Sequence, residues 1–131
     1  MKTAYKTFAT TFAIVIFLAA AISAGFVAGA RWNEAEYRTM RVTAYCPCEK
    51  CCGKYADGIT ASGHVIQAGD RFCAASKDYP FGTMITIPGY GKAEVRDRGG
   101  AIKENRLDVY FDTHQEALNW GVKNLTVKVR R

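Results

Sequence analysis

From residue 40 onward the chain consists of short alternating segments separated by turn residues. The run that contains Leu107, Val109 and Phe111 has apolar residues at every second position, which is the period of a half-buried strand, and we predict six short strands in all. They span residues 40–45, 71–75, 84–87, 92–96, 106–111 and 125–129. Glycine and proline clusters, such as residues 80–82 and 88–91, mark the turns between them. We therefore predict a mainly β fold, a six-stranded barrel with one or two short helices.

One segment carries the signals of a clear helix. We predict it over residues 113–119, with Asp112 as N-cap, because an aspartate side chain accepts hydrogen bonds from the free amides of a first helical turn. Gln115 stands three residues after the cap, where a capping-box partner is expected. Gly121 follows the segment and predicts its end.

The N-terminal residues have the pattern of an export segment. No charged residue occurs from Thr7 to Ala30, and Lys2 and Lys6 precede this stretch. Residues 28–30 fit a small-residue cleavage site, yet the stretch is also long enough, at about 20 residues, to span a bilayer as an uncleaved anchor. Both outcomes stay open. In either case we expect an N-terminal apolar helix and a domain that lies outside the cytoplasm.

These patterns divide the chain into three expected parts. Residues 1–30 form a signal peptide or signal anchor, residues 31–39 a linker, and residues 40–131 the barrel domain. The domain is expected to be exported, and to be periplasmic or cell-wall-associated. If the leader is retained, residues 7–30 would anchor it in the inner (cytoplasmic) membrane.

The charge of the chain is mildly basic. Its 131 residues carry a formal net charge of +6, and removal of Lys2 and Lys6 leaves 16 basic and 12 acidic residues, or +4. A charge this weak and this dispersed does not favour nucleic acid, whereas it suits an anionic cell-wall polymer or a membrane face. We expect a monomer.

Four of the five cysteines crowd into seven residues. The cluster consists of Cys46, Cys48, Cys51 and Cys52, and Cys73 stands alone. Disulfides are favoured in an exported domain, but five is odd, so at least one thiol must stay free, pair with another chain or serve a metal. Zinc and free thiols remain alternatives, although the neighbouring Cys51 and Cys52 cannot easily both face one metal. We predict disulfides within the cluster, no metal site and no cofactor.

Three aspartates are the strongest candidates for function. Asp108 lies inside the alternating segment 106–111, although aspartate is depleted in strands, so its position needs a cause. Asp97 precedes the glycines of residues 99–100, where the backbone can approach a ligand closely. With Asp112 at the end of the strand, we expect three carboxylates to converge on one cleft.

Each aspartate also has a structural interpretation. A helix cap fully explains Asp112. Asp97 could form a turn by bonding to the amides that follow it. Asp108 would be structural if it paired with Arg96 or Arg106.

Other polar residues are weaker candidates. Tyr45, Thr60 and Ser62 suit the wall of a sugar-binding cleft, because aromatic and hydroxyl groups match sugar faces and hydroxyls, although Tyr45 could equally belong to the core. We expect His64 and His114 to lie in solvent. Neither has a sequence context that ties it to a thiol, so a cysteine nucleophile is not predicted.

Five motifs resemble those of the three-aspartate (3D) domain. They are Thr43-Ala-Tyr45, Gly58-Ile-Thr-Ala-Ser-Gly63, Pro80-Phe-Gly-Thr83, Asp97-Arg-Gly-Gly-Ala-Ile102 and Arg106-Leu-Asp-Val-Tyr-Phe-Asp112. The resemblance covers residues 40–129 and implies a double-psi β-barrel, similar to the catalytic part of membrane-bound lytic transglycosylase A. Rare lipoprotein A also looks related. Many relatives carry Val-Asp-Pro before a Pro-Leu-Gly turn, whereas this chain has Ala75-Ser-Lys77, so an acid acting from that strand is missing.

The resemblance implies a peptidoglycan lytic transglycosylase, which cleaves MurNAc–GlcNAc glycosidic bonds with 1,6-anhydro product formation in cell-wall remodelling. Asp108 matches the position of the catalytic acid, and Asp97 would tune it and hold substrate. The partner implied is the peptidoglycan glycan strand. The residues expected to bind it are Asp112, Thr60, Ser62, Tyr45, Gly99 and Gly100.

Two other functions stay open. A non-catalytic cell-wall (glycan) binding or expansin-like module would use the same barrel, because fold does not decide chemistry. An inverting glycosidase would need two carboxyl groups about 6.5–9.5 Å apart, with water between them.

Overall fold

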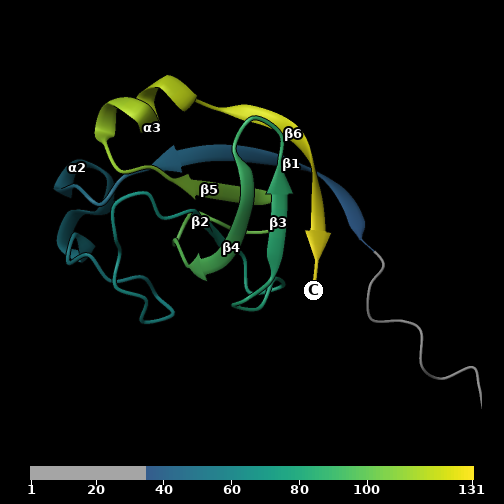
Figure 1. Ribbon diagram of the computed structural model, residues 1–131, viewed down its shortest axis with the longest axis horizontal. Coiled ribbons are helices and arrows are strands. Elements are labelled where there is room, and N and C mark those ends of the chain that lie inside the picture. Colours follow the sequence, from purple (N-terminus) through teal and green to yellow (C-terminus); the bar gives the residue numbers. More distant parts are fainter. Residues whose placement is uncertain (1–34) are drawn as a thin grey trace, which may run out of the picture. The chain divides into compact units, whose positions relative to one another are not determined.

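Six strands and two short helices follow one another along residues 35–131, the part of the chain that the computed structural model describes (Figure 1). The strands are β1 (Glu36–Tyr45), β2 (Phe72–Ala75), β3 (Met84–Ile87), β4 (Gly91–Asp97), β5 (Arg106–Tyr110) and β6 (Lys123–Arg130). The helices are α2 (Glu49–Cys52) and α3 (His114–Trp120), and a 3-10 turn, η1 (Gly53–Tyr55), follows α2. Each of the six segments predicted as a strand contains one.

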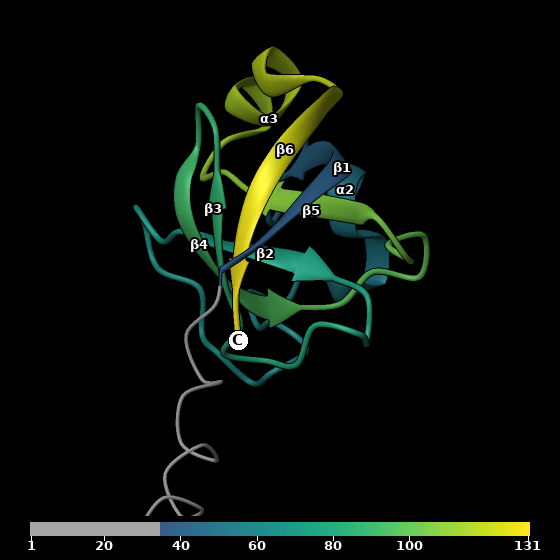
Figure 2. The same ribbon diagram turned by 90° about the vertical axis from the view of Figure 1, so that its right-hand side faces the viewer.

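The strands close into a barrel in the order β1-β5-β2-β4-β3-β6. β1 runs parallel to β5, and β2 runs parallel to β4, whereas the other neighbouring pairs are antiparallel. β2 therefore lies between two strands that come later in the chain, as can be followed in Figure 2. The predicted six-stranded, mainly β barrel with short helices is confirmed.

β1 is the strand that closes the barrel. Its residues 36–42 pair with β6, and its residues 41–45 pair with β5. The strand begins at Glu36, four residues before the predicted start at residue 40. The additional residues at its start, Glu-Tyr-Arg-Thr, show no alternation of buried apolar positions. They belong to the strand because their backbone pairs with β6.

The barrel interior is filled by aliphatic side chains from all six strands. Val42, Ile85, Val95, Val109 and Val127 are 0% exposed. Removing such side chains from water stabilises the fold by about 1.5–3 kcal/mol each. This core fixes the strand register, because a slip by one residue would turn the buried faces outward.

An aromatic cluster lies beside this core. The rings of Phe72 and Tyr110 stack with their centroids 4.5 Å apart, and the ring of Tyr45 packs edge-on against both. All three side chains are buried. The cluster joins the ends of β1, β2 and β5 and fixes the direction of the Tyr45 hydroxyl.

The first turn of α3 corrects the predicted cap. Thr113, and not Asp112, is the N-cap: its hydroxyl accepts a hydrogen bond from the amide of Glu116 (3.2 Å), and the Glu116 carboxylate accepts one from the amide of Thr113 (3.1 Å). This reciprocal pair is a complete capping box, so Gln115 is not the partner. The predicted end is confirmed, because Gly121 caps the helix with a φ of 69°.

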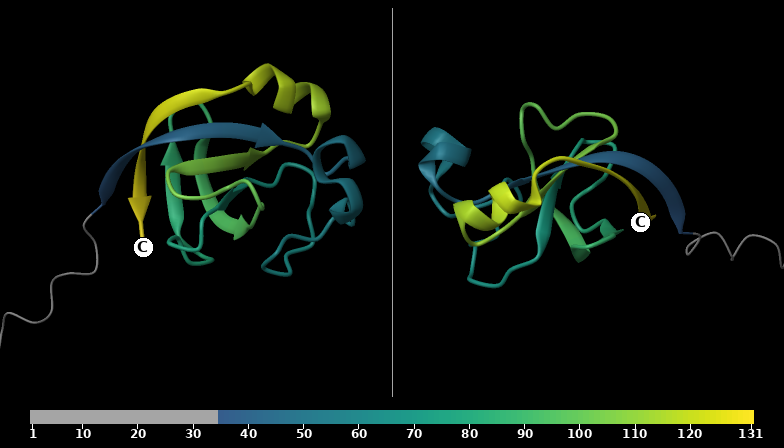
Figure 3. Two further views of the ribbon diagram at one scale, coloured as in Figure 1. Left: turned by 180° about the vertical axis from the view of Figure 1, so that it is seen from behind. Right: turned by 90° about the horizontal axis from the view of Figure 1, so that it is seen from above.

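Both helices lie at the same end of the barrel, beyond the C-terminal end of β1 (Figures 1 and 3). Among residues 35–131, no helix has the length and apolar character that crossing a membrane requires. The expected N-terminal apolar helix and the signal peptide or anchor of residues 1–30 lie outside the described residues.

Tyr90 provides a test of the barrel packing. Its buried hydroxyl donates to the carbonyl of Tyr110 at 2.6 Å and lies 3.3 Å from the carbonyl of Phe72. Tyr90→Phe should therefore lower the free energy of unfolding by about 1–3 kcal/mol in urea titrations, because buried acceptors lose their donor. The matched control, Tyr37→Phe at a side chain that is 66% exposed, should change it by less than about 0.5 kcal/mol. Equal effects of the two substitutions would contradict this account.

Candidate active site

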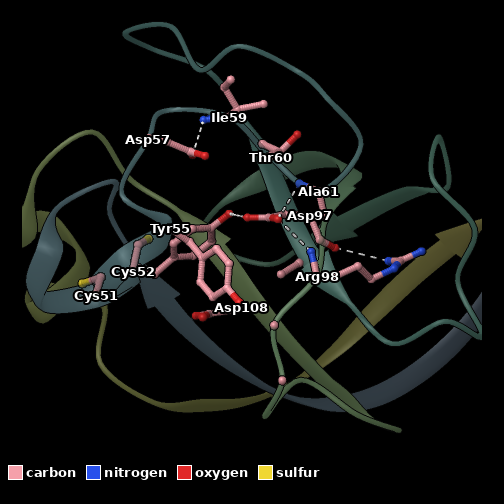
Figure 4. Close-up of a pocket in the computed structure, with 14 residues that line it drawn as sticks. Cys51, Cys52, Tyr55, Asp57, Ile59, Thr60, Ala61, Asp97, Arg98 and Asp108 are labelled. Carbon is pink, nitrogen blue, oxygen red and sulfur yellow. Dashed lines mark hydrogen bonds between the residues drawn. The ribbon is translucent and has the colours of Figure 1, made fainter.

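A pocket of about 610 Å³ opens on one side of the barrel. Residues of β1, β2, β4 and β5 line it, together with residues of two further segments: 51–61, which comprises the end of α2, η1 and the loop after it, and the turn 98–100. Its size falls in the range of small-molecule and sugar sites. Figure 4 shows that Asp97 and Asp108 both belong to its lining.

Asp97 and Asp108 flank Ala74 in one row across three neighbouring strands. The register pairs Ala74 of β2 with Asp97 of β4 on one side and with Asp108 of β5 on the other. The β2–β4 register shifts between Cys73 and Ala74, so Arg96 is skipped. A bulge of this kind re-aims side chains, and here it brings an acid to the place that a regular ladder would give to Arg96. Strand spacing sets the two aspartate Cα atoms about 9–10 Å apart.

The Asp108 side chain is half-buried in the pocket wall. Its Oδ1 accepts a hydrogen bond from the hydroxyl of Thr43 on β1 at 2.8 Å. Arg96 and Arg106 bond to other groups, so an ion pair with either does not explain this acid in a strand. Burial raises the pKa of Asp108 to about 6; the Thr43 bond opposes this rise, and the charge of Asp97 adds to it.

The Asp97 carboxylate is held by three donors from three parts of the chain. The Tyr45 hydroxyl donates to Oδ2 at 2.5 Å, and the amides of Ala61 and Arg98 donate to Oδ1 at 2.9 and 2.8 Å. Asp97 thus bonds within its own turn and also fastens the 58–66 loop. Burial and this bond raise the pKa of Tyr45 far above its usual range, so the hydroxyl stays a donor. Tyr45 belongs both to the core and to the pocket wall.

The Arg98 side chain turns its charge to other partners. Its guanidinium donates to the carbonyls of Ala75 (3.1 Å) and Tyr79 (2.9 Å) and lies over the ring of Phe81, 4.1 Å from the centroid. These contacts fix the turn after β4 to the end of β2. They also commit the cation of Arg98 to backbone carbonyls, so it forms no ion pair with Asp97 or Asp108.

Three of the other residues expected to bind substrate line the pocket: Thr60, Gly99 and Gly100. Thr60 is buried, and its hydroxyl lies 3.0 Å from that of Ser62. Ser62 itself does not line the pocket. A Cβ atom added at Gly99 would lie 2.8 Å from Ile102, so any side chain there would displace this neighbour.

Asp112 does not converge with the other two aspartates. It lies in a separate depression of about 110 Å³, where its carboxylate accepts hydrogen bonds from the amide of Gly69 (2.9 Å) and the hydroxyl of Tyr110 (3.2 Å). β5 ends at Tyr110, so the chain has left the strand before it reaches Asp112. The alternation of strand β5, which would place residues 108 and 112 on one face, therefore ends before Asp112.

The residues at the pocket rim could not be identified from the sequence. Tyr55 is 69% exposed and Ile59 is 50% exposed, and both line the pocket together with Asp57. Cys51 and Cys52 line it as well. These residues come from α2, η1 and the loop that follows, a stretch whose elements are too short to show an apolar period in the sequence.

His64 was expected to lie in solvent, but its side chain is bonded on both sides. Its ring nitrogens lie 2.7 Å from the Asp70 carboxylate and 2.9 Å from the Arg96 guanidinium. The bond to His64 lowers the pKa of Asp70. This network holds the 58–66 loop against β4.

The predicted disulfides are not present. All five cysteines of the described residues are free, and the cluster splits into two parts. Cys52 turns away and donates its thiol to the carbonyl of Cys46 (3.3 Å). The thiols of Cys46, Cys48 and Cys51 instead gather around Nδ1 of His114, a residue expected in solvent. These four side chains could hold a metal ion.

A comparison with models of known protein families identifies one part of the chain. Residues 71–130 match the family model of the 3D domain, so this part of the chain is a 3D domain, as its motifs indicated. The fold resembles that of the Streptomyces papain inhibitor (SPI), with a TM-score of 0.52 and 18% sequence identity over 73% of this chain and 96% of that chain. At this identity the likeness concerns the fold alone, a double-psi-like barrel.

Three curated relatives come from Bacillus subtilis (strain 168). The cell wall-binding protein YocH is 39% identical over 55% of this chain and 26% of its own length. The putative cell wall shaping protein YabE is 33% identical over 76% of this chain and 25% of its length. The SPbeta prophage-derived uncharacterized protein YorM is 34% identical over 65% of this chain and 37% of its length. The chain thus spans about a quarter of the first two relatives.

The burial of Asp108 should reduce stability at neutral pH. Its folded pKa of about 6 lies above the ordinary 3.8, so the folded state binds the proton more tightly. The free energy of unfolding therefore falls as the pH rises from about 4 to above 6, by about 3 kcal/mol in total. Asp108→Asn lacks the charge and should be more stable than wild type by up to this amount at pH 8, but not at pH 4.

Urea titrations of both proteins at the two pH values measure this difference. Asp78→Asn, at an exposed aspartate outside the pocket, is the matched control and should change stability by less than about 0.5 kcal/mol. A pH-independent effect of Asp108→Asn would show that the carboxyl is well solvated.

Proposed function

We propose that this domain is a peptidoglycan lytic transglycosylase, with Asp108 as its catalytic acid. The observation that carries the proposal is the half-buried carboxyl of Asp108 in the pocket, whose pKa is raised to about 6. A group with this pKa holds a proton at mildly acidic pH and can release it within a turnover. The membership of the 3D family supports the same role.

The reaction needs one carboxyl group that acts twice. Asp108 first donates its proton to the glycosidic oxygen, and the bond from that oxygen to C1 of MurNAc breaks as an oxocarbenium-like centre develops. The Asp108 carboxylate then takes the proton of the C6 hydroxyl, and the C6 oxygen bonds to C1 to close the 1,6-anhydro ring. No water is consumed, and Asp108 ends the cycle protonated.

Asp97 would tune Asp108 and hold the substrate. Its negative charge raises the pKa of Asp108, which keeps the acid protonated. Both of its oxygens already accept hydrogen bonds, from Tyr45, Ala61 and Arg98. A carboxylate committed in this way is a poor base for activating water, which favours the transglycosylase over an inverting hydrolase.

The relatives support the cell wall as the target. YocH is named for binding the cell wall and YabE for shaping it. The exposed Tyr55 and Ile59 at the pocket rim offer apolar surface against which sugar rings can pack. We propose that residues 1–30 export the protein, which then acts on glycan strands outside the cytoplasm.

A non-catalytic wall-binding module is the second candidate. The name of YocH favours it, because that relative is described as a binding protein. The missing strand acid at Ala75-Ser-Lys77 also removes one group that many family members carry. This module would hold glycan in the same pocket without cleaving it.

Digestion of purified sacculi separates the two candidates. The full-length protein, solubilised in mild detergent, should release 1,6-anhydro-muropeptides that mass spectrometry identifies. Asp108→Asn should lower the rate by at least about 10²–10⁴-fold, because it removes the proton donor. Asp78→Asn, outside the pocket, should cleave at the wild-type rate. Reducing-end products would indicate hydrolysis, and sacculus binding without any product would establish the binding module.

The rate should fall as the pH rises through about 6, where Asp108 loses its proton. Asp97→Asn removes a negative charge, so the pKa of Asp108 should fall and the alkaline limb of the pH–rate profile should move to lower pH. Thr43→Val removes the bond that stabilises the Asp108 carboxylate, so the limb should move to higher pH. Rates measured from pH 4 to 8 test these opposite shifts, and limbs that stay in place would rule out Asp108 as the acid.

A further inference from the structure

We propose that Cys46, Cys48, Cys51 and His114 bind one Zn²⁺ ion. The four side chains converge from three elements: the end of β1, the region of α2 and the first residue of α3. Their ligand atoms all lie within 4.8 Å of one another. The proposal does not depend on the lytic activity.

The distances fit a tetrahedral site. Nδ1 of His114 lies 3.7, 3.6 and 3.4 Å from the sulfurs of Cys46, Cys48 and Cys51. Bonds of about 2.3 Å to sulfur and about 2.0–2.1 Å to nitrogen would set these separations at about 3.6 Å. The sulfurs of Cys46 and Cys51 lie 3.6 Å apart, close to the about 3.8 Å of two zinc thiolates. The 3.0 Å between the sulfurs of Cys46 and Cys48 would have to lengthen by about 0.8 Å. The sulfurs of Cys48 and Cys51 lie within the 4.8 Å that holds for all four ligand atoms.

The direction of Cys52 removes the objection drawn from the sequence. Two adjacent cysteines cannot easily face one metal, and here only Cys51 faces the cluster. Cys52 bonds to the Cys46 carbonyl and lines the pocket, and Cys73 is buried on β2 in the barrel core. Of the five thiols, three are thus placed as ligands, whereas those of Cys52 and Cys73 lie in other environments.

The ligand types select zinc among common metal ions. Three thiolates and one imidazole form one of the recurrent structural zinc sets, whereas calcium and magnesium require oxygen ligands. Each thiol gives up its proton when it binds the metal. Cys51 is exposed, which leaves a path for the ion to enter.

The metal would have a structural role beside the pocket. Four protein ligands fill a tetrahedral zinc site and leave no position for substrate. The ion would join the segment after β1 to α3, because Cys51 and His114 lie 63 positions apart in the sequence. That segment also supplies Cys52 and Tyr55 to the pocket wall, so the metal would fix one side of the pocket.

Metal analysis of matched variants tests the proposal. The full-length protein, purified in detergent with reductant and without chelator, should contain one zinc per chain. In competition with a chromophoric chelator, His114→Ala and Cys51→Ser should weaken zinc binding by at least the about 10–100-fold that loss of an outer-shell partner costs. His64→Ala and Cys52→Ser should bind zinc like wild type. Equal weakening in all four variants would overturn the site.

A second measurement needs no variant. Alkylation of the zinc-loaded protein, read by peptide mass spectrometry, should leave Cys46, Cys48 and Cys51 protected, and a chelator should expose them. Cys73, which is buried in the barrel core, should stay unreactive before and after chelation. A zinc-free protein that is two hydrogens lighter would carry a disulfide and refute the proposal, as would unprotected thiols in the zinc-loaded form.

Discussion

Closure of the barrel depends on β1, which pairs with two strands along its length. Residues 36–42 form the ladder with β6, and residues 41–45 form the ladder with β5. The second ladder places Thr43 opposite Asp108 and carries Tyr45 to Asp97. A slip of β1 by one residue would reverse its faces, so the closure, the polar contacts of the pocket and the start of the cysteine cluster share one register.

The half-buried carboxyl of Asp108 in the pocket lowers the stability of the fold at neutral pH. An isolated carboxyl in a strand is unfavourable, and the structure offsets this with a single hydrogen bond from Thr43 and no cation. Arg98, the cation that lines the pocket, is committed to two backbone carbonyls. A site that costs stability in this way is typical of a functional position, and the aliphatic core of the barrel provides the margin.

The strands and the unusual position of Asp108 could be predicted because both follow from local alternation. Glu36 could not be assigned to a strand, because its segment is held only by pairing with β6. Asp112 was expected beside Asp108, but β5 ends before it. The convergence of His114 on the thiols joins residues far apart in sequence, and the bulge that brings Asp97 into line depends on β2. Such features follow from tertiary packing and produce no periodic pattern in the sequence.

Ala74 lies between the two acids of the pocket, and only its methyl group fills the row there. A branched or aromatic side chain at this position would project into the space between Asp97 and Asp108. The site would then be blocked by volume alone, while both charges and the strand pairing remained. A single substitution on β2 could therefore separate the ability to admit a ligand from the acidity of the site, and the pocket could be closed without any change in the barrel.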